Sequence, residues 1–275
     1  MYDLNGKVAL VTGAGGERGI GRAIVLRLAD EGAAVVVNDL NIDEGDSVWR
    51  GVDSVVSELE ERGSDAMAVL ADVADAAQVD GMVARAMDRF GRIDILVNSA
   101  ASRPGRDRMS VVDLDEDAWD QVQRVNVKGT FLCCRAVARR MIERGEGGKI
   151  VNISSTTGKQ GVARMAAYSA SKAAVIAFTQ ALALEVAPHR VNVNAICPGM
   201  VDTDRVEHLA AAMRPEGVSA EDHHTRMLKE RAARIPLGRV AEAADVAAMA
   251  AFLASSQSDY LTGLAMNVSG GTDMR

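Results

Sequence analysis

Cysteine, proline and aromatic side chains are scarce in this sequence. Its 275 residues include three cysteines, five prolines and only 3% Phe, Trp and Tyr. Cys133, Cys134 and Cys197 are an odd number without CxxC spacing, and the first two are adjacent in a helical run. This pattern disfavours a disulfide framework and a zinc site, so we interpret the cysteines as buried free thiols. No metal site is expected elsewhere in the chain.

The sequence is also short of long hydrophobic runs and of positive charge. The apolar runs at 8–12, 33–38 and 93–98 are far shorter than the roughly 20 residues that cross a bilayer. The N-terminus lacks the charged and apolar regions of a signal peptide. The formal net charge is −7 and the pI is about 5.2, which gives no basic field for a polyanion. We therefore expect a cytoplasmic protein that binds neither nucleic acid nor a membrane.

What the chain does contain is a regular alternation of short apolar runs and helical segments, without an internal repeat or a long linker. We expect strands at residues 8–12, 33–38, 66–70, 93–98, 148–154, 190–196 and 264–268. We expect one helix after the first strand and others at 43–63, 75–90, 115–143, 165–187 and 242–254. This alternation predicts an α/β fold, a single domain over residues 1–275 with a Rossmann-like doubly wound parallel sheet of about seven strands flanked by helices.

Residues 200–238 break this alternation. They combine much charge with Met, Pro and Gly, which indicates a partly helical flap over the carboxyl edge of the sheet. A flap in that position would shape a substrate pocket, whereas the alternative is a surface insertion without a role. His223 and His224 lie in this stretch, and we expect both to face solvent because adjacent residues diverge on a helix or a strand.

The stretch from Ser155 to Lys172 carries the strongest indication of chemistry. Tyr168 and Lys172 are four residues apart in an Ala-rich helical segment, so their side chains share one helix face. Lowering a tyrosine pKa from ~10 to near neutrality requires about 4 kcal/mol of phenolate stabilisation, much of which a neighbouring ammonium can supply. Ser155 follows the strand at 148–154, at the edge where open α/β sheets place their chemistry. A lone YxxxK pair is usually a chance match, so the rest of the chain decides this interpretation.

A glycine-rich loop follows the first strand and precedes a helix. Its glycines permit a tight turn, and the helix N-terminus presents free N–H groups to a pyrophosphate. The loop contains Gly13, Gly15, Gly16, Gly19 and Gly21. This spacing is not GxGxxG, and a flexible connection is the alternative.

Two aspartates extend this interpretation. Asp39 ends the second strand, eighteen residues after Gly21, close to the offset at which an acidic side chain meets the ribose hydroxyls of NAD. Its carboxylate would repel a 2′-phosphate, and its alternative role is to start a turn. Asp72 follows the third strand, where it could meet the adenine amino group or cap the next helix.

Together these residues resemble the short-chain dehydrogenase/reductase family from end to end of the chain. The family's catalytic Asn–Ser–Tyr–Lys tetrad falls here on Asn126, Ser155, Tyr168 and Lys172. Matching family motifs imply contacts with the cofactor from the following residues: Gly13, Gly15, Arg18, Gly19, Ile20, Gly21, Asp39, Asp72, Val73, Asn98, Ala100, Tyr168, Lys172, Pro198, Gly199, Val201 and Thr203.

The chain departs from the family pattern in two places. The loop between Gly13 and Gly19 is two residues longer than the usual TGxxxGxG, and residues 98–101 read AsnSerAlaAla instead of AsnAsnAlaGly. Arg18 is a basic residue of the kind often found in NADP-using members. Asp39, followed by Leu40 and Asn41 rather than a basic residue, outweighs it, so NAD is the expected cofactor and NADP remains open.

The resemblance also implies roles for the tetrad. Tyr168 exchanges the proton of the substrate hydroxyl, and Ser155 holds the substrate oxygen while a hydride passes to or from the nicotinamide. Lys172 lowers the Tyr168 pKa and binds the nicotinamide ribose, and Asn126 holds a water that links Lys172 to solvent. Thr203 and the Val201 backbone hold the carboxamide.

Three functions are compatible with these residues. The first is an oxidoreductase that transfers a hydride between NAD(H) and a secondary alcohol or ketone, with a polyol, a sugar-like or a hydroxy-acyl compound as its small-molecule substrate. The second is an NADPH-dependent 3-oxoacyl-[acyl-carrier-protein] reductase, which Arg103, Arg106 and Arg108 keep open. The third, a non-catalytic dinucleotide sensor, is disfavoured by the intact tetrad.

Helices apolar on nearly every side at 115–143 and 165–186 predict a homotetramer.

Overall fold

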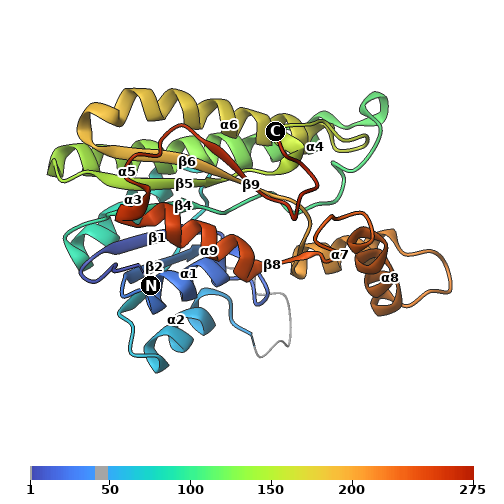
Figure 1. Cartoon of the computed structure of the whole chain (residues 1–275), viewed down its shortest axis with the longest axis horizontal. Helices are drawn as coiled ribbons and strands as arrows, with labels where there is room; N and C mark the ends of the chain where they lie inside the picture. Colours follow the sequence, from blue (N-terminus) through green and yellow to red (C-terminus); the bar gives the residue numbers. More distant parts are fainter. Residues whose placement is uncertain (1, 41–48) are drawn as a thin grey trace.

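The computed structural model describes residues 2–40 and 49–275 (Figure 1). Its centre is a parallel sheet of seven strands in the order β3-β2-β1-β4-β5-β6-β9, which confirms the predicted fold class. The strands are β1 Val8–Thr12, β2 Ala34–Asp39, β3 Ala66–Leu70, β4 Ile95–Asn98, β5 Gly148–Ile153, β6 Val191–Pro198 and β9 Ala265–Val268. The strand order reverses beside β1, because β2 and β4 pair with its two sides. In such a sheet ligands bind at the carboxyl ends of the strands that flank this reversal.

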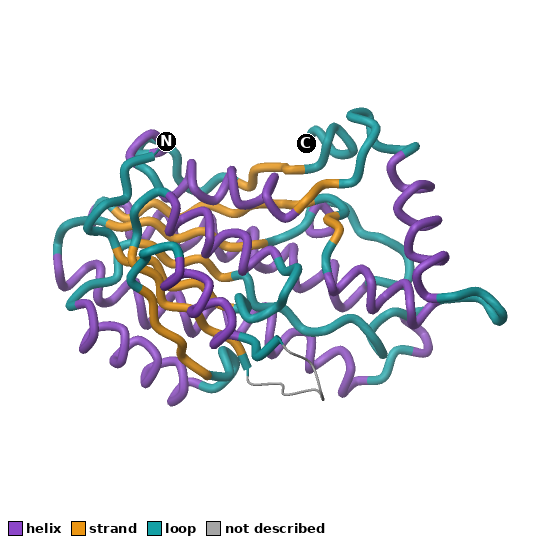
Figure 2. The backbone as a smooth tube through the Cα atoms, turned by 90° about the horizontal axis from the view of Figure 1, so that it is seen from below, coloured by secondary structure: helices purple, strands orange, loops and turns teal. Residues whose placement is uncertain are grey.

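Helices cover both faces of the sheet, and Figure 2 shows the strands gathered into one layer between them. One core lies between the sheet and α1, α2 and α9, and the other lies between the sheet and α3, α5 and α6. The helices are α1 Ile20–Asp30, α2 Val52–Glu61, α3 Ala76–Phe90, α4 Glu116–Gln123, α5 Thr130–Arg144, α6 Ala166–Val186 and α9 Ala243–Ala254. Burial on both faces explains why the strands read as continuous apolar runs rather than alternating patterns.

Two of the expected helices differ from the structure. The helix predicted at 43–63 is present as α2 from Val52, and residues 41–48 lie outside the described part of the chain. The single helix predicted at 115–143 is divided into α4 and α5 by a π-helical turn at Arg124–Gly129. Close packing accompanies this turn, since a Cβ at Gly129 would lie 2.8 Å from Cγ2 of Val73. Asn126 lies within the turn, and π turns of this kind frequently occur at functional sites.

The stretch 200–238 contains two helices, α7 Asp204–Met213 and α8 Ala220–Ala232, which project from the main body in Figure 1. A short strand, β7 Val201–Asp202, precedes them and pairs with β8 Ala241–Glu242. The prediction that His223 and His224 face solvent is wrong. His223 Nδ1 lies 2.8 Å from the Ala210 carbonyl oxygen, and His224 Nε2 lies 3.2 Å from Asp202 Oδ1. Both are partly buried because α8 packs back against α7 and β7.

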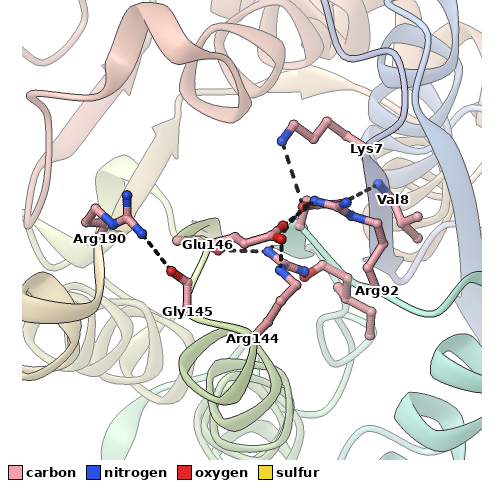
Figure 3. Close-up of polar contacts among 10 residues, drawn as sticks. Lys7, Val8, Arg92, Arg144, Gly145, Glu146 and Arg190 are labelled. Atoms are coloured by element: carbon pink, nitrogen blue, oxygen red, sulfur yellow. Dashed lines mark hydrogen bonds and ion pairs between the residues drawn. The ribbon is translucent and has the colours of Figure 1, made fainter.

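Charged residues tie β1, β4 and α5 together at the amino edge of the sheet (Figure 3). At their centre is Asp94, 5% exposed, which accepts the Val8 N–H at 3.0 Å and bonds from Arg92 at 2.7 and 2.8 Å. Arg144, Lys7 and Glu146 complete the cluster. Burial raises the Asp94 pKa, but these N–H donors and cations outweigh it and hold the pKa below its usual value. The cluster braces the edge of the sheet opposite the predicted site.

Candidate active site

The glycine loop packs directly against the end of β4. A Cβ at Gly13 would lie 2.5 Å from Cα of Ala100, and one at Gly21 would lie 2.2 Å from the Gly13 carbonyl oxygen. Neither position can therefore carry a side chain without displacing backbone. The residue before α1 is Gly19, which has no side chain with which to cap the free N–H groups of this helix. A tight cradle that leads to an uncapped helix N-terminus fits the pyrophosphate of a dinucleotide.

Asp39 lies beside this loop at the carboxyl end of β2. Its Oδ2 accepts a hydrogen bond from the Gly15 N–H at 2.8 Å, and its Oδ1 accepts one from the Leu40 N–H at 2.8 Å. Burial raises the pKa of this carboxyl, while the two N–H donors and the charge of Arg103 oppose the rise. The carboxylate is thus fixed next to the loop, at the distance along the chain that a ribose contact requires.

Arg18 is directed toward the stretch 200–238. Its guanidinium lies 3.1 Å from Oδ1 of Asp202 and 3.1 Å from Oε2 of Glu207. Its backbone N–H donates to Oδ2 of Asp204 at 2.8 Å. Two carboxylates already pair with Arg18. This side chain is therefore a weaker indication of 2′-phosphate binding than its sequence position suggests.

Asp72 and Asn98, both predicted to contact the cofactor, have protein partners. Asp72 forms an ion pair with Arg124 at 2.9 Å, and the cap of α3 is Asp75 instead. Asn98 is 4% exposed and donates to Oδ1 of Asn152 at 2.8 Å, so its side chain braces β4 against β5. The Asp72 side chain is 20% exposed and stays at the carboxyl edge.

Four further predicted cofactor residues lie where β6 ends. Pro198 is the last residue of β6, and a Cβ at Gly199 would lie 3.2 Å from Cα of Ser269. Val201 begins β7, and Thr203 is the residue that precedes α7 and is 6% exposed. These residues connect the sheet to the stretch 200–238.

The structure brings the predicted catalytic residues together at the carboxyl edge. Ser155 lies two residues after the end of β5, and Tyr168 and Lys172 lie in the first turns of α6. Lys172 is 3% exposed, its Nζ donates to the Ile153 carbonyl at 2.7 Å, and it lies 5.7 Å from the centre of the Tyr168 ring. The i,i+4 spacing therefore places the ammonium next to the phenol, as the sequence predicted.

Comparisons with known proteins agree with this geometry. A family model described as Enoyl-(Acyl carrier protein) reductase matches residues 13–273. The chain is 38% identical to sorbitol dehydrogenase of Cereibacter sphaeroides, covering 98% of this chain and 99% of that protein. It is 39% identical to galactitol 2-dehydrogenase of Agrobacterium fabrum, over 98% of this chain and 99% of that protein. The chain belongs to the short-chain dehydrogenase/reductase family.

Solved structures of the family have the same fold. A short-chain dehydrogenase/reductase from Burkholderia xenovorans superposes with a TM-score of 0.87 at 36% identity, covering 100% of this chain and 99% of that one. Family membership makes the protein an enzyme, a short-chain alcohol dehydrogenase or ketone reductase that uses a nicotinamide dinucleotide.

The electrostatics of this short-chain dehydrogenase/reductase favour an acidic phenol at Tyr168. Burial raises the pKa of Tyr168, but the charges of Lys172, Arg205 and Arg108 and a hydrogen bond with Ser155 outweigh it and hold the pKa below its usual value. For Lys172, burial lowers the pKa, and the charge of the neighbouring Tyr168 opposes this shift. Both shifts bring the two groups closer to the pH range in which a proton can be exchanged.

Asn126, the fourth member of the tetrad, is held from three sides. Its Oδ1 accepts the Ser102 N–H at 2.8 Å, and its Nδ2 donates to Oγ of Ser171 at 2.9 Å. Its carbonyl accepts a bond from Oγ1 of Thr130 at 2.8 Å. Asn126 therefore links the loop after β4 to α6, the helix that carries Tyr168 and Lys172.

Two arginines converge on Tyr168. Sequence reasoning named Arg108 only within a basic group and missed Arg205. The guanidinium carbon of Arg108 lies 4.5 Å from the centre of the Tyr168 ring, and that of Arg205 lies 5.2 Å away. Arg108 comes from the loop after β4 and Arg205 from the first turn of α7. Their places in the sequence could have indicated a role at the site. Arg108 belongs to the basic group at 103–108, and Arg205 follows Thr203 by two residues.

Proposed function

We propose that this enzyme transfers a hydride between NAD(H) and a secondary alcohol or ketone, and that its substrate is a polyol, a sugar-like or a hydroxy-acyl compound. The observation that carries the proposal is Tyr168, which has a lowered pKa and lies beside Lys172 and Ser155. The polyols in the names of two relatives support the substrate class.

In the oxidising direction, Tyr168 as phenolate removes the proton of the substrate hydroxyl. The Ser155 hydroxyl donates a hydrogen bond to the same oxygen and fixes the carbinol next to the phenol. The bound nicotinamide supplies the acceptor for the carbinol hydride. Lys172 stabilises the phenolate by its charge and is positioned to bind the nicotinamide ribose. For the reverse reaction Tyr168 returns the proton to the carbonyl oxygen.

We assign the cofactor to the cradle of glycines after β1, with the adenosine ribose at Asp39. Gly13 and Gly21 provide the close backbone approach, and the uncapped N-terminus of α1 provides N–H donors for the pyrophosphate. The stretch 200–238 acts as the flap over the substrate. The Arg18 pairs with Asp202 and Glu207 connect this flap to the cradle.

The preference for NAD over NADP is expected to depend on Asp39. Asp39→Ala removes the acceptor for the ribose hydroxyls and the charge that repels a 2′-phosphate, so the NAD/NADP ratio of kcat/KM should fall by about 10- to 100-fold, the range of one or two charged hydrogen bonds. Steady-state rates with both cofactors measure the ratio. Arg18→Ala is the control and should leave the ratio unchanged, because that side chain is paired with the flap. A wild-type enzyme that turns over NADP faster at equal concentration would contradict the assignment.

The alternative function is an NADPH-dependent 3-oxoacyl reductase, which is supported by a 37% identical relative from Staphylococcus aureus named 3-oxoacyl-[acyl-carrier-protein] reductase. A panel of secondary alcohols, polyols and 3-hydroxyacyl thioesters, each assayed with NAD and NADP by nicotinamide absorbance, distinguishes the two. Turnover of polyols with NAD supports the proposal, and exclusive turnover of 3-hydroxyacyl thioesters with NADP replaces it. Cofactor binding without turnover of any compound would favour a dinucleotide sensor.

We also propose a homotetramer, assembled through α5 and α6. Leu184 on α6 is 80% exposed and Phe131 on α5 is 40% exposed, and the Phe131 ring meets that of Phe178 edge to face at 6.3 Å. An exposed apolar face of this kind is usually buried against the same face of another subunit in a symmetric oligomer. Light scattering at micromolar concentration should give about four times the 29.1 kDa chain mass. A monomeric mass would contradict this prediction.

One described segment, Ala166–His189, is long and apolar enough to cross a membrane by length and composition alone. It comprises α6 and the short turn after it, and it packs along β6 and carries Tyr168 and Lys172. A buried core helix passes the same test, so we propose a cytoplasmic enzyme whose apolar helix faces its own sheet and its partner subunits.

A further inference from the structure

The surroundings of Tyr168 contain more positive charge than proton exchange requires. Lys172 is already next to the phenol, and the guanidinium groups of Arg108 and Arg205 lie 4.5 and 5.2 Å from the ring centre. These arginines come from two separate segments, the loop after β4 and the first turn of the flap. A cation over an aromatic ring gains some energy from the ring itself, but this does not satisfy the N–H donors of a guanidinium.

Arg108 has donors that the protein leaves unused. Its side chain is 12% exposed, and within residues 2–40 and 49–275 its buried Nε and Nη1 have no hydrogen-bond acceptor. Oδ2 of Asp107 is its ion-pair partner, but it lies 3.6 Å from Nη1, beyond hydrogen-bond distance. Burial lowers the pKa of Arg108, and the charge of Arg205 lowers it further, against the opposing effect of Asp107. Buried donors without acceptors are costly, and ligand-binding sites are a usual place for them.

Arg205 leaves the local charge unbalanced. Its Nη1 donates to the Ser102 carbonyl oxygen at 2.6 Å, and no described carboxylate forms an ion pair with it. Around Tyr168 there are thus three cations, Lys172, Arg108 and Arg205, and Asp107 is the carboxylate paired with them in the described part of the chain. The Tyr168 phenolate offsets one further charge, so a neutral alcohol would still leave one cation uncompensated.

We propose that Arg108 and Arg205 form an anion subsite beside Tyr168, so that the preferred substrate carries an anionic oxygen group, a carboxylate or a phosphate ester, near the carbinol. This inference rests on the proposed function, because Tyr168 marks the position of the carbinol. The planar guanidinium fork matches the paired oxygens of either group, and such charge-assisted bonds are stronger than neutral ones. The substrate class narrows accordingly from neutral polyols to hydroxycarboxylates and phosphorylated sugars.

An alternative role for the two arginines is to acidify Tyr168 without touching the substrate. That role affects every substrate equally, since it acts on the phenol that all of them share. An anion subsite affects only substrates that carry the charge. Matched substrate pairs therefore separate the two roles.

The experiment compares kcat/KM for matched substrates that differ in charge, namely gluconate with sorbitol and a 3-hydroxycarboxylate with its methyl ester. A sugar phosphate tests recognition of a phosphate ester. Wild-type kcat/KM should favour an anionic member by at least about tenfold, the low end for a charged hydrogen bond. Arg108→Met and Arg205→Met should each reduce that preference at least about tenfold, and Arg108→Lys should restore part of it by keeping the charge without the fork. Arg106→Met is the matched control, since its side chain is 73% exposed and pairs with Asp115.

A measurement without turnover completes the test. Calorimetry of gluconate and of a sugar phosphate binding to the NAD-loaded enzyme should show affinity that Arg108→Met and Arg205→Met weaken and Arg106→Met does not. Equal losses on charged and neutral substrates, or unchanged anion binding in both variants, would overturn the subsite. Turnover of sorbitol with no anion preference would overturn the subsite and leave the proposed function standing. Anion binding without turnover of any compound would retain the subsite and reject the proposed function.

Discussion

Tyr168→Phe is expected to lower kcat by about 10²- to 10⁴-fold, the usual contribution of a general acid–base group, with NAD affinity nearly unchanged. The substitution keeps the ring, so the contacts of Arg108 at 4.5 Å and Lys172 at 5.7 Å remain. It deletes the one hydroxyl that we assign to proton exchange with the substrate. Binding and catalysis should therefore separate cleanly in this variant.

The measurement is kcat on the best substrate of the panel, together with NAD affinity by fluorescence quenching. Tyr260→Phe is the matched control, because Tyr260 is a fully exposed tyrosine and the chemical change is the same. In the wild type, the oxidation rate should rise with pH through the lowered pKa of Tyr168, and this limb should disappear in Tyr168→Phe. If Tyr168→Phe retained more than about a tenth of wild-type kcat, the proton-exchanging group would lie elsewhere.

Lys172→Met is expected to lower both kcat and the affinity for NAD. Lys172 contributes the largest of the charge effects that hold the Tyr168 pKa below its usual value, so its loss raises that pKa. Because the phenolate is the active form in oxidation, the alkaline limb of the pH–rate profile should move to higher pH. We expect a loss in kcat of about 10²-fold or more near neutral pH. The assigned contact with the ribose accounts for the weaker cofactor binding.

Three readouts distinguish this role from a structural one. Lys172 donates to the Ile153 carbonyl, so the melting temperature of Lys172→Met records any loss of packing at the end of β5. The pH profile and NAD affinity record its effects on the phenol and the ribose. Lys7→Met is the control, since Lys7 lies at the opposite edge of the sheet, 4.0 Å from Asp94. A Lys172→Met enzyme with an unshifted pH profile would show that Lys172 does not tune Tyr168.

The two proposed functions of the site depend on residues at different separations in the sequence. Proton exchange uses Tyr168 and Lys172, which are one helical turn apart. The proposed anion subsite uses Arg108 and Arg205, which belong to separate segments and meet only across the edge of the sheet. On this proposal, substrate preference can change with the loop after β4 and the stretch 200–238 while the proposed catalytic pair on α6 stays fixed.

The sequence by itself determined the features that depend on local spacing. Apolar runs separated by helical segments indicated the doubly wound sheet, because each strand buried on both faces must be apolar throughout. The glycines at 13 and 21 indicated a close backbone approach after β1, and the distance from Gly21 to Asp39 indicated the end of β2. The spacing of Tyr168 and Lys172 indicated a shared helix face. These relations hold within single elements or between consecutive ones.

Only the tertiary structure decided which distant side chains meet. Arg18 pairs with acids of the flap, Asn98 braces Asn152, and the π turn places Asn126 against the loop after β4. Arg108 and Arg205 gather at Tyr168 in the same way. Periodicity specifies which face of an element is buried, but long polar side chains at loop ends choose partners by how the loops pack over the sheet. That packing depends on the whole fold, and so the charge around Tyr168 became visible only in the structure.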